Sequence, residues 1–150
     1  MRGTTQVPSV YVILKREGKI AFLQRTNTDF MNGKYTLPAG HVEGLETYRE
    51  AAVRETEEEA GVRVAQESLR HVHTMERHCG DHIRIDLFFA ADLWEGEPIN
   101  NEPEMHGELA WFEADNLPNE KIMDFEASAL LSIAEGKTYS EYGWPQDKGL

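Results

Sequence analysis

The strongest structural signal in the sequence is a helix over residues 46–60 whose two ends are both marked. Thr47 followed by Glu50 matches the S/T-x-x-E capping box that begins a helix. The alanines and glutamates that follow favour helix, and Gly61 stands where a left-handed C-cap is expected. Because β-rich runs lie on both sides of this helix, the chain is limited to folds that pack helices against a sheet.

Three carboxylates share one face of this helix. Glu55, Glu58 and Glu59 are spaced i, i+3 and i+4, and each pair of like charges costs a few tenths of a kcal/mol. A divalent cation would offset that repulsion, because Mg²⁺ prefers oxygen ligands and is held by one or two carboxylates plus substrate phosphates. The alternative is a solvated acidic surface with i, i+4 ion pairs between Arg54 and Glu50 or Glu58. The helix alone leaves both interpretations open.

The remaining pattern predicts strands before and after this helix and a second helix near the C-terminus. Expected extended segments are residues 10–14, 20–23, 35–37, 62–64, 69–77, 83–93 and 109–112. Residues 124–135 should form the second helix, and the polar tail, about residues 137–150, should lie along the surface. This order predicts a single α/β domain over residues 1–150, with a mixed sheet rather than a βαβ repeat.

Charge and composition exclude several classes of protein. The formal net charge is −12, of which residues 40–62 carry −5 and residues 95–104 carry −4. An acidic chain is a poor candidate for binding a nucleic-acid backbone, so we expect no nucleic-acid partner. Apolar runs are too short to span a bilayer and no secretory leader is evident. The single cysteine excludes an internal disulfide framework, and a reducing cytoplasm is the expected location.

Histidines in the chain do not form a recognisable metal motif. His71 and His73 alternate and should share one strand face. With His78, His82 and Cys79 their spacing fits no standard zinc finger, so we do not expect zinc.

The residues around the acidic helix carry a more specific pattern. The pattern runs from Gly40 through five residues to Glu46, seven residues to Arg54-Glu55-Thr56, one residue to Glu58-Glu59, and one residue to Gly61-Val62. It resembles the signature of the Nudix hydrolase family, G-x5-E-x7-R-E-U-x-E-E-x-G-U, where U is a bulky aliphatic residue. Thr56 at the first U is the only departure, and we expect it to pack slightly less well without loss of chemistry.

The resemblance implies a fold and a set of site residues. The fold would be an α/β/α sandwich with a mixed sheet over nearly the whole chain, with the signature at residues 40–62. Ligands for Mg²⁺ or Mn²⁺ would be Glu55, Glu58 and Glu59 with the backbone carbonyl of Gly40. Arg54 would orient a glutamate, and Glu46 would be a supporting residue paired with it.

The implied reaction is hydrolysis of a pyrophosphate bond in a nucleoside diphosphate derivative, with a carboxylate accepting the proton of the attacking water. Glu55 is the first candidate for this base. The loop over residues 95–108 offers Glu102 and Glu104 instead, and we take Glu104 as the catalytic candidate there; the alternative is a loop acidic for solubility.

Candidate substrate-binding residues lie outside the signature. Arg25 ends a strand near the signature loop and can hold a phosphate oxygen, although a surface arginine is the plainer interpretation. Tyr35 or Phe30 can stack on a base, or each can belong to the core.

The expected partner is a small nucleotide. A nucleoside triphosphate, including an oxidised one, is the leading substrate; a nucleotide sugar or ADP-ribose is the alternative. A non-catalytic nucleotide sensor with the same fold is the alternative of another class, and the intact glutamates argue against it. A homodimer is an expectation from the family.

Overall fold

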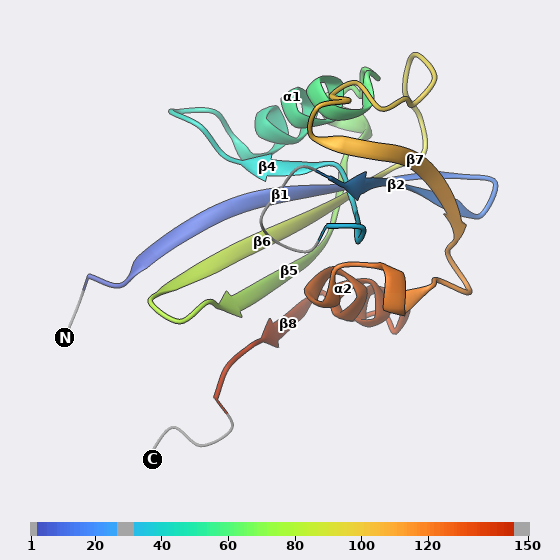
Figure 1. Cartoon of the computed structure of the whole chain (residues 1–150). Helices are drawn as coiled ribbons and strands as arrows, with labels where there is room; N and C mark the ends of the chain where they lie inside the picture. The colour runs from blue at the N-terminus through green and yellow to red at the C-terminus, as the bar shows by residue number, and fades with distance from the viewer. Residues whose placement is uncertain (1–2, 27–31, 146–150) are drawn as a thin grey trace.

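The computed structural model describes residues 3–26 and 32–145 (Figure 1). Its strands are β1 (Thr5–Arg16), β2 (Lys19–Arg25), β3 (Tyr35–Thr36), β4 (Ala39–His41), β5 (Arg70–His78), β6 (His82–Ala91), β7 (His106–Glu113) and β8 (Tyr139–Tyr142). The helices are α1 (Tyr48–Ala60) and α2 (Asp124–Ala134), with short 3-10 turns at Gln66–Ser68 and Asn119–Lys121. Neither α-helix of this described part is long and apolar enough to cross a membrane.

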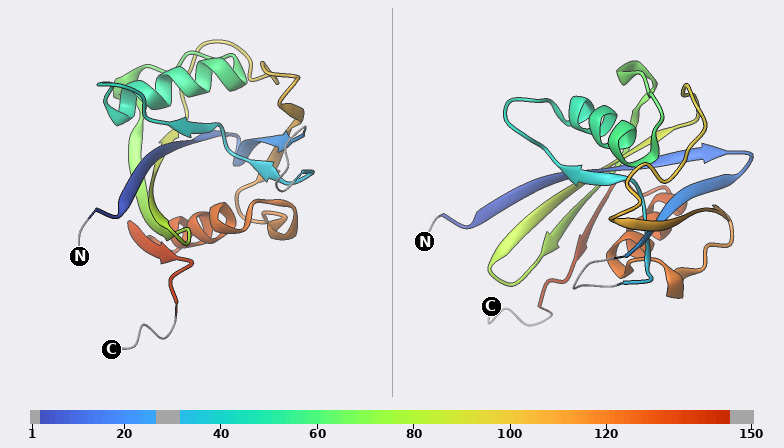
Figure 2. Two further views of the ribbon diagram at one scale, coloured as in Figure 1. Left: turned by 60° about the vertical axis from the view of Figure 1, so that its left-hand side comes forward. Right: turned by 45° about the horizontal axis from the view of Figure 1, so that its top comes forward.

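The strands form one mixed sheet in the order β3-β2-β1-β6-β5-β8, with β4 also paired to β1 and β7 to β2. β1 runs parallel to β6 and β5 runs parallel to β8, whereas the other pairs are antiparallel. Helix α1 covers one face and α2 the other, as Figure 2 shows from the side. The predicted α/β sandwich with a mixed sheet is therefore confirmed.

The central strand β1 contributes to a separate core on each face of the sheet. Val10, Val12 and Leu14 pack under α1, whereas Tyr11 and Ile13 pack under α2. Successive side chains of a strand point to opposite faces, so a strand covered on both sides is apolar throughout. This double coverage fixes both helices relative to β1.

The tail differs from its prediction over residues 139–142. Instead of only lying along the surface, β8 adds a parallel edge strand to β5. The imidazole of His73, which is fully buried, joins the two segments: Nδ1 donates to the carbonyl of Lys137 (2.9 Å) and Nε2 accepts from the hydroxyl of Ser140 (2.7 Å). This long-range pairing has no local sequence signal.

His71 and His73 do not share a strand face, contrary to the prediction. A bulge in β5 between them sets His71 opposite Phe89 and His73 opposite Phe88. Because adjacent residues of β6 point to opposite faces, the two histidines contact opposite cores. The inserted residue breaks the alternation on which the prediction depended.

A buried carboxylate joins α2 to the segment that leads into β4. Glu126 is 1% exposed, and its carboxylate accepts from the hydroxyl of Thr36 (2.5 Å) and the backbone N–H of Leu37 (2.8 Å). Burial raises the pKa of Glu126 from its ordinary value of 4.5 to about 7, and the two hydrogen bonds offset only part of that shift. The folded protein therefore holds a proton on Glu126 at a pH where the unfolded chain releases it.

We expect Glu126→Gln to remove a pH-dependent component of stability. Because the folded-state pKa is raised, the stabilisation from the protonated group is complete below about pH 4.5 and is lost as the pH rises to about 7. Relative to wild type, Glu126→Gln should gain up to about 3 kcal/mol of unfolding free energy across that interval. Urea unfolding at several pH values measures this, with exposed Glu120→Gln as the control. A constant difference from pH 4 to 8 would refute the assigned pKa.

Candidate active site

Helix α1 is capped at both ends as the sequence predicts. The hydroxyl of Thr47 accepts from the N–H of Glu50 (3.1 Å), and the Glu50 carboxylate accepts from the N–H of Thr47 (2.7 Å). Gly61 adopts φ 71° and donates its N–H to the carbonyl of Glu57 (3.0 Å). These caps determine where the helix begins and ends.

Glycine is required at position 40 by the approach of Glu55. Gly40 lies in β4, a short strand outside the extended segments expected from the sequence, and is paired with Val10 of β1. A Cβ atom on Gly40 would lie 2.1 Å from the carboxyl carbon of Glu55. Glu55 is 9% exposed. The signature glycine and its first helical glutamate are therefore in direct contact, and no other residue type fits between them.

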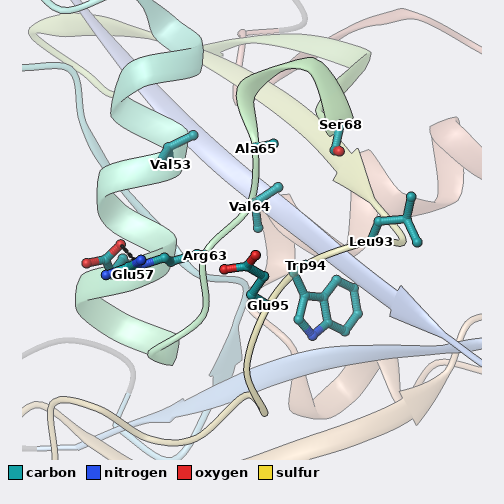
Figure 3. Close-up of a pocket in the computed structure, with 9 residues that line it drawn as sticks. All are labelled: Val53, Glu57, Arg63, Val64, Ala65, Ser68, Leu93, Trp94 and Glu95. Carbon is teal, nitrogen blue, oxygen red and sulfur yellow. Dashed lines mark ion pairs between the residues drawn. The ribbon is translucent and has the colours of Figure 1, made fainter.

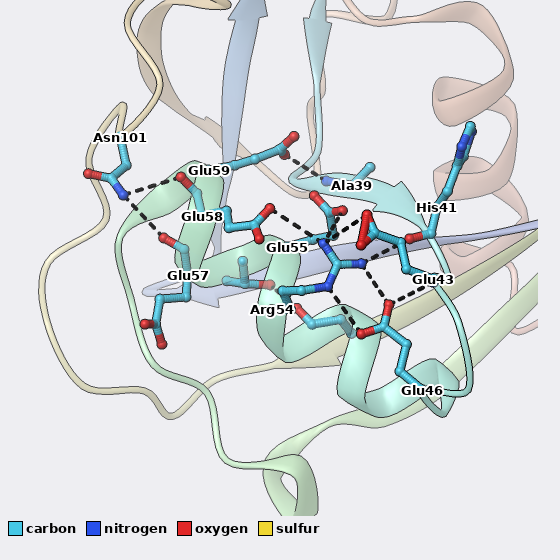
Figure 4. Close-up of polar contacts among 12 residues, drawn as sticks. Ala39, His41, Glu43, Glu46, Arg54, Glu55, Glu57, Glu58, Glu59 and Asn101 are labelled. Carbon is cyan, nitrogen blue, oxygen red and sulfur yellow. Dashed lines mark hydrogen bonds and ion pairs between the residues drawn. The ribbon is translucent and has the colours of Figure 1, made fainter.

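Arg54 joins the carboxylates of the signature to one another (Figure 4). Its guanidinium donates to Glu46 (2.6 and 3.1 Å), to Glu55 (2.8 Å) and to Glu58 (3.4 Å). It also donates to the carbonyl of His41 (3.0 Å). The predicted pairing of Glu46 with Arg54 is present, and these hydrogen bonds lower the pKa of Glu46.

Glu59 faces the chain segment just before Gly40. Its carboxylate accepts from the N–H of Ala39 (2.9 Å). Burial nonetheless raises the pKa of Glu59 well above its ordinary value, with Glu55 and Glu102 adding repulsion. Burial likewise raises the pKa of Glu55, although Arg54 opposes this. A nearby cation would relieve both shifts.

The acidic segment of residues 95–104 packs against the C-terminal end of α1. Ile99 and Asn101 donate backbone N–H groups to the carbonyls of Ala60 and Glu59, each at 2.9 Å. The side-chain amide of Asn101 donates to the carbonyls of Glu57 (3.3 Å) and Glu58 (3.2 Å). These bonds satisfy the free carbonyls of the last helical turn, so the two acidic segments lie together.

Glu102, more than Glu104, acts on the helix carboxylates. Glu102 raises the pKa of both Glu55 and Glu59, while burial and the charges of Glu58 and Glu104 raise its own. Glu104 is exposed, and its charge contributes to the raised pKa of Glu102. Sequence spacing did not distinguish these two glutamates, because the loop path decides which one turns toward α1.

The donor set suits Mg²⁺ bound together with substrate. No three carboxylate, imidazole or thiolate groups in residues 3–26 and 32–145 are arranged to hold an ion by themselves. Mg²⁺ does not require such a cage, because it keeps waters and uses one or two carboxylates plus phosphates. The close approach of Glu55 to Gly40, with Glu58 and Glu59 alongside, supplies oxygen donors of that kind.

The opposite side of α1 carries no part of this cluster. Thr56 is fully buried there and donates to the carbonyl of Ala52 (2.6 Å), which satisfies its hydroxyl at the position where the signature expects an aliphatic residue. Glu57 points toward Arg63 (3.8 Å) in a shallow cavity of about 470 Å³ (Figure 3). Glu57 is thus a glutamate of the same helix that lies outside the site, and it can serve as a control for the signature glutamates.

The two predicted substrate-binding residues have different positions. Arg25, at the end of β2, lines a cavity of about 290 Å³ together with Gly40. Tyr35 is 8% exposed; its ring packs edge-on against Phe112 and its hydroxyl donates to Glu108. Tyr35 therefore belongs to the core, the alternative left open above, and Phe30 lies outside the described residues.

The same cavity contains residues that the sequence did not single out. His41, Arg77, Arg84 and Glu126 line its wall. Burial and Arg84 both lower the pKa of His41. These side chains come from β4, β5, β6 and α2, so only strand register brings them together, and no local spacing indicates them.

Comparison with known proteins agrees with this geometry. The sequence model of the NUDIX domain matches residues 5–132. An uncharacterized Nudix hydrolase of Bacillus subtilis is 28% identical over 83% of this chain and 77% of its own length. An ADP-ribose pyrophosphatase of Methanocaldococcus jannaschii is 35% identical over 74% of this chain, and the match spans 65% of that protein.

Solved structures give the same result. A MutT Nudix hydrolase from Burkholderia pseudomallei superposes with a TM-score of 0.75 at 26% identity, covering 85% of this chain and 97% of that one. The predicted fold and the predicted class of enzyme, a hydrolase of phosphoric anhydride bonds, are confirmed at the level of the family. The chain belongs to the Nudix hydrolase family, whose members generally use divalent metal ions and act on small nucleotide substrates.

Proposed function

We propose that this protein hydrolyses a pyrophosphate bond of a nucleoside diphosphate derivative, using Mg²⁺ or Mn²⁺. The observation that carries the proposal is the contact of the Glu55 carboxylate with Gly40, held by Arg54, which also binds Glu46 and Glu58. This arrangement gathers negative charge where a cation-bound pyrophosphate is expected.

In the proposed reaction, the oxygen of a water molecule forms a new bond to phosphorus and the bridging P–O bond breaks. The metal supplies charge neutralisation and a lower pKa for that water. Glu58, Glu59, Glu55 and the carbonyl of Gly40 would provide its protein ligands. Arg54 is a positioning residue, because its hydrogen bonds hold Glu55 and Glu58 on one side of the helix.

A carboxylate would accept the proton released by the water. Glu55 is buried beside Gly40, and its carboxylate is held there by Arg54, so it lies where the bound pyrophosphate is expected. The charge of Glu102 acts on Glu55, and Glu104 lies further along the same loop. We propose Glu55 as the base and keep Glu102 and Glu104 as the alternatives to be tested.

The leading substrate is a nucleoside triphosphate, including an oxidised one. The M. jannaschii relative is named as an ADP-ribose pyrophosphatase, which supports ADP-ribose as a second candidate. Every signature carboxylate is present in this chain, which argues against a non-catalytic sensor. A panel of nucleoside triphosphates, nucleotide sugars and ADP-ribose with Mg²⁺ tests the proposal; absence of turnover on the whole panel would overturn it.

That the protein forms a homodimer and that it is located in the cytoplasm both remain predictions from the sequence.

Replacing one metal ligand should remove activity without unfolding the protein. Glu58→Gln keeps the size of a side chain that is 49% exposed but removes its charge, so kcat should fall about 100-fold or more. Glu57→Gln, one residue away on the other side of the helix, should retain activity. Equal rates for the two variants would show that the metal ligands are assigned incorrectly.

Mg²⁺ should stabilise the folded protein through the same residues. A ligand present at about 100 times its Kd adds about 2.7 kcal/mol to the unfolding free energy. We expect thermal unfolding to show a higher Tm in Mg²⁺ than in EDTA for wild type and Glu57→Gln, and a smaller increase for Glu58→Gln. An unchanged Tm for wild type across a Mg²⁺ titration would contradict the site.

Two substitutions in the loop decide between the candidate bases. If Glu55 is the base, Glu102→Gln should lower kcat only a few-fold through its charge, and Glu104→Gln should leave it near the wild-type value. A fall of about 100-fold in either variant, with a normal Tm in Mg²⁺, would move the base to that residue. The pH–rate profile of each variant provides the second measurement.

A further inference from the structure

The cavity beside Gly40 gathers positive charge in a chain whose formal net charge is −12. It has a volume of about 290 Å³, and its wall includes Ser9, Arg25, Gly40, His41, Arg77 and Arg84. A cationic wall beside an acidic cluster favours a ligand that carries negative charge into the cavity.

Arg77 and Arg84 are direct cross-strand neighbours, paired in the register of β5 with β6. Like charges placed directly opposite one another destabilise a sheet. Asp86 offsets one of them, because its carboxylate lies 2.7 and 3.4 Å from the guanidinium of Arg77. Arg77 is also stacked over the ring of Phe125, 3.6 Å from its centroid. The charge of Arg77 is thus compensated locally.

Arg84 has neutral partners instead. Its guanidinium donates to the hydroxyl of Ser9 (3.3 Å) and to Nε2 of His41 (2.9 Å). Among residues 3–26 and 32–145 no carboxylate forms a direct ion pair with it; the charge of Asp86 acts on Arg84 from nearby, but both Asp86 oxygens are hydrogen-bonded to Arg77. Glu126 lines the same cavity, but both of its oxygens already accept hydrogen bonds from Thr36 and Leu37. The positive charge of Arg84 is therefore available to an anionic ligand in the cavity.

A single residue connects Arg84 to the proposed metal site. His41 follows Gly40 in β4, and its imidazole points away from the cluster around Arg54 (Figure 4) toward Arg84. Gly40 itself faces Glu55 and also lines the cavity. A phosphate chain that binds a cation held by Glu55 and passes Gly40 would thus enter the cavity whose wall includes Arg84.

We propose that Arg84 forms a phosphoryl-binding subsite that holds a third phosphoryl group, beyond the two that share the scissile bond. The proposal rests on the proposed function and extends it, because it selects nucleoside triphosphates over nucleotide sugars and ADP-ribose. In those diphosphate substrates an uncharged sugar would occupy the subsite and leave a desolvated guanidinium without an anion, which is costly. A phosphoryl oxygen forms a charge-assisted hydrogen bond with the same group.

Comparing two substrate classes in one variant tests the subsite. Arg84→Gln should lower kcat/KM for ATP and GTP about 10- to 100-fold, chiefly through KM, because hydrogen bonds to charged groups contribute about 1.5–3 kcal/mol. Its kcat/KM for ADP-ribose should not fall, because the uncharged sugar forms no charge-assisted hydrogen bond that the variant would lose. Arg84→Lys should recover part of the loss, and Arg70→Gln, an exposed arginine of β5, should match wild type.

A binding measurement without metal separates the subsite from catalysis. Inorganic triphosphate in EDTA should raise the Tm of wild type and Arg70→Gln, but not that of Arg84→Gln. An equal loss of kcat/KM on both substrate classes, or no loss on either, would overturn the subsite even if wild type is an active hydrolase. If wild type hydrolyses no nucleotide, the proposed function fails, and the triphosphate measurement still decides whether Arg84 binds phosphoryl groups.

Discussion

The guanidinium of Arg54 is the interaction on which the site depends. It lies within hydrogen-bonding distance of Glu46, Glu55 and Glu58 and of the carbonyl of His41. One cation thereby joins the segment before the helix, the short strand β4 and one face of α1. Without it, the carboxylates of Glu46, Glu55 and Glu58 would repel one another. A single positive charge holds them together and leaves a net negative site that divalent cations can complete.

The sheet positions the site because its pairing determines where β4 lies relative to β1 and β6. β1 pairs with β4 on one part of its length and runs parallel to β6, so Gly40 and Arg84 lie on either side of the same strand. The acidic cluster and the cationic cavity consequently meet at His41. Under the proposed function, metal ions would offset the acidic cluster and Arg84 would offer positive charge on the other side, so an acidic protein could accept a polyanion.

Sequence reasoning was most successful where chemistry depends on local spacing. The capping box, the C-cap at Gly61 and the shared face of Glu55 and Glu58 all follow from intervals of three or four residues along one helix. It was less successful where contacts cross the sheet. Glu102 and Glu104 are equivalent in composition, and only the hydrogen bonds of Asn101 to the end of α1 bring Glu102 to the site.

The sequence by itself determined the family signature, the acidic helix and the alternation of strands and helices, because each depends on residues within a short stretch of chain. Tertiary structure alone decided that Tyr35 is buried, that His71 and His73 face opposite cores, and that Arg77 and Arg84 stand side by side. A bulge of one residue reverses a strand face, and register joins residues distant in sequence. Such contacts depend on which strands pair, which no local pattern encodes.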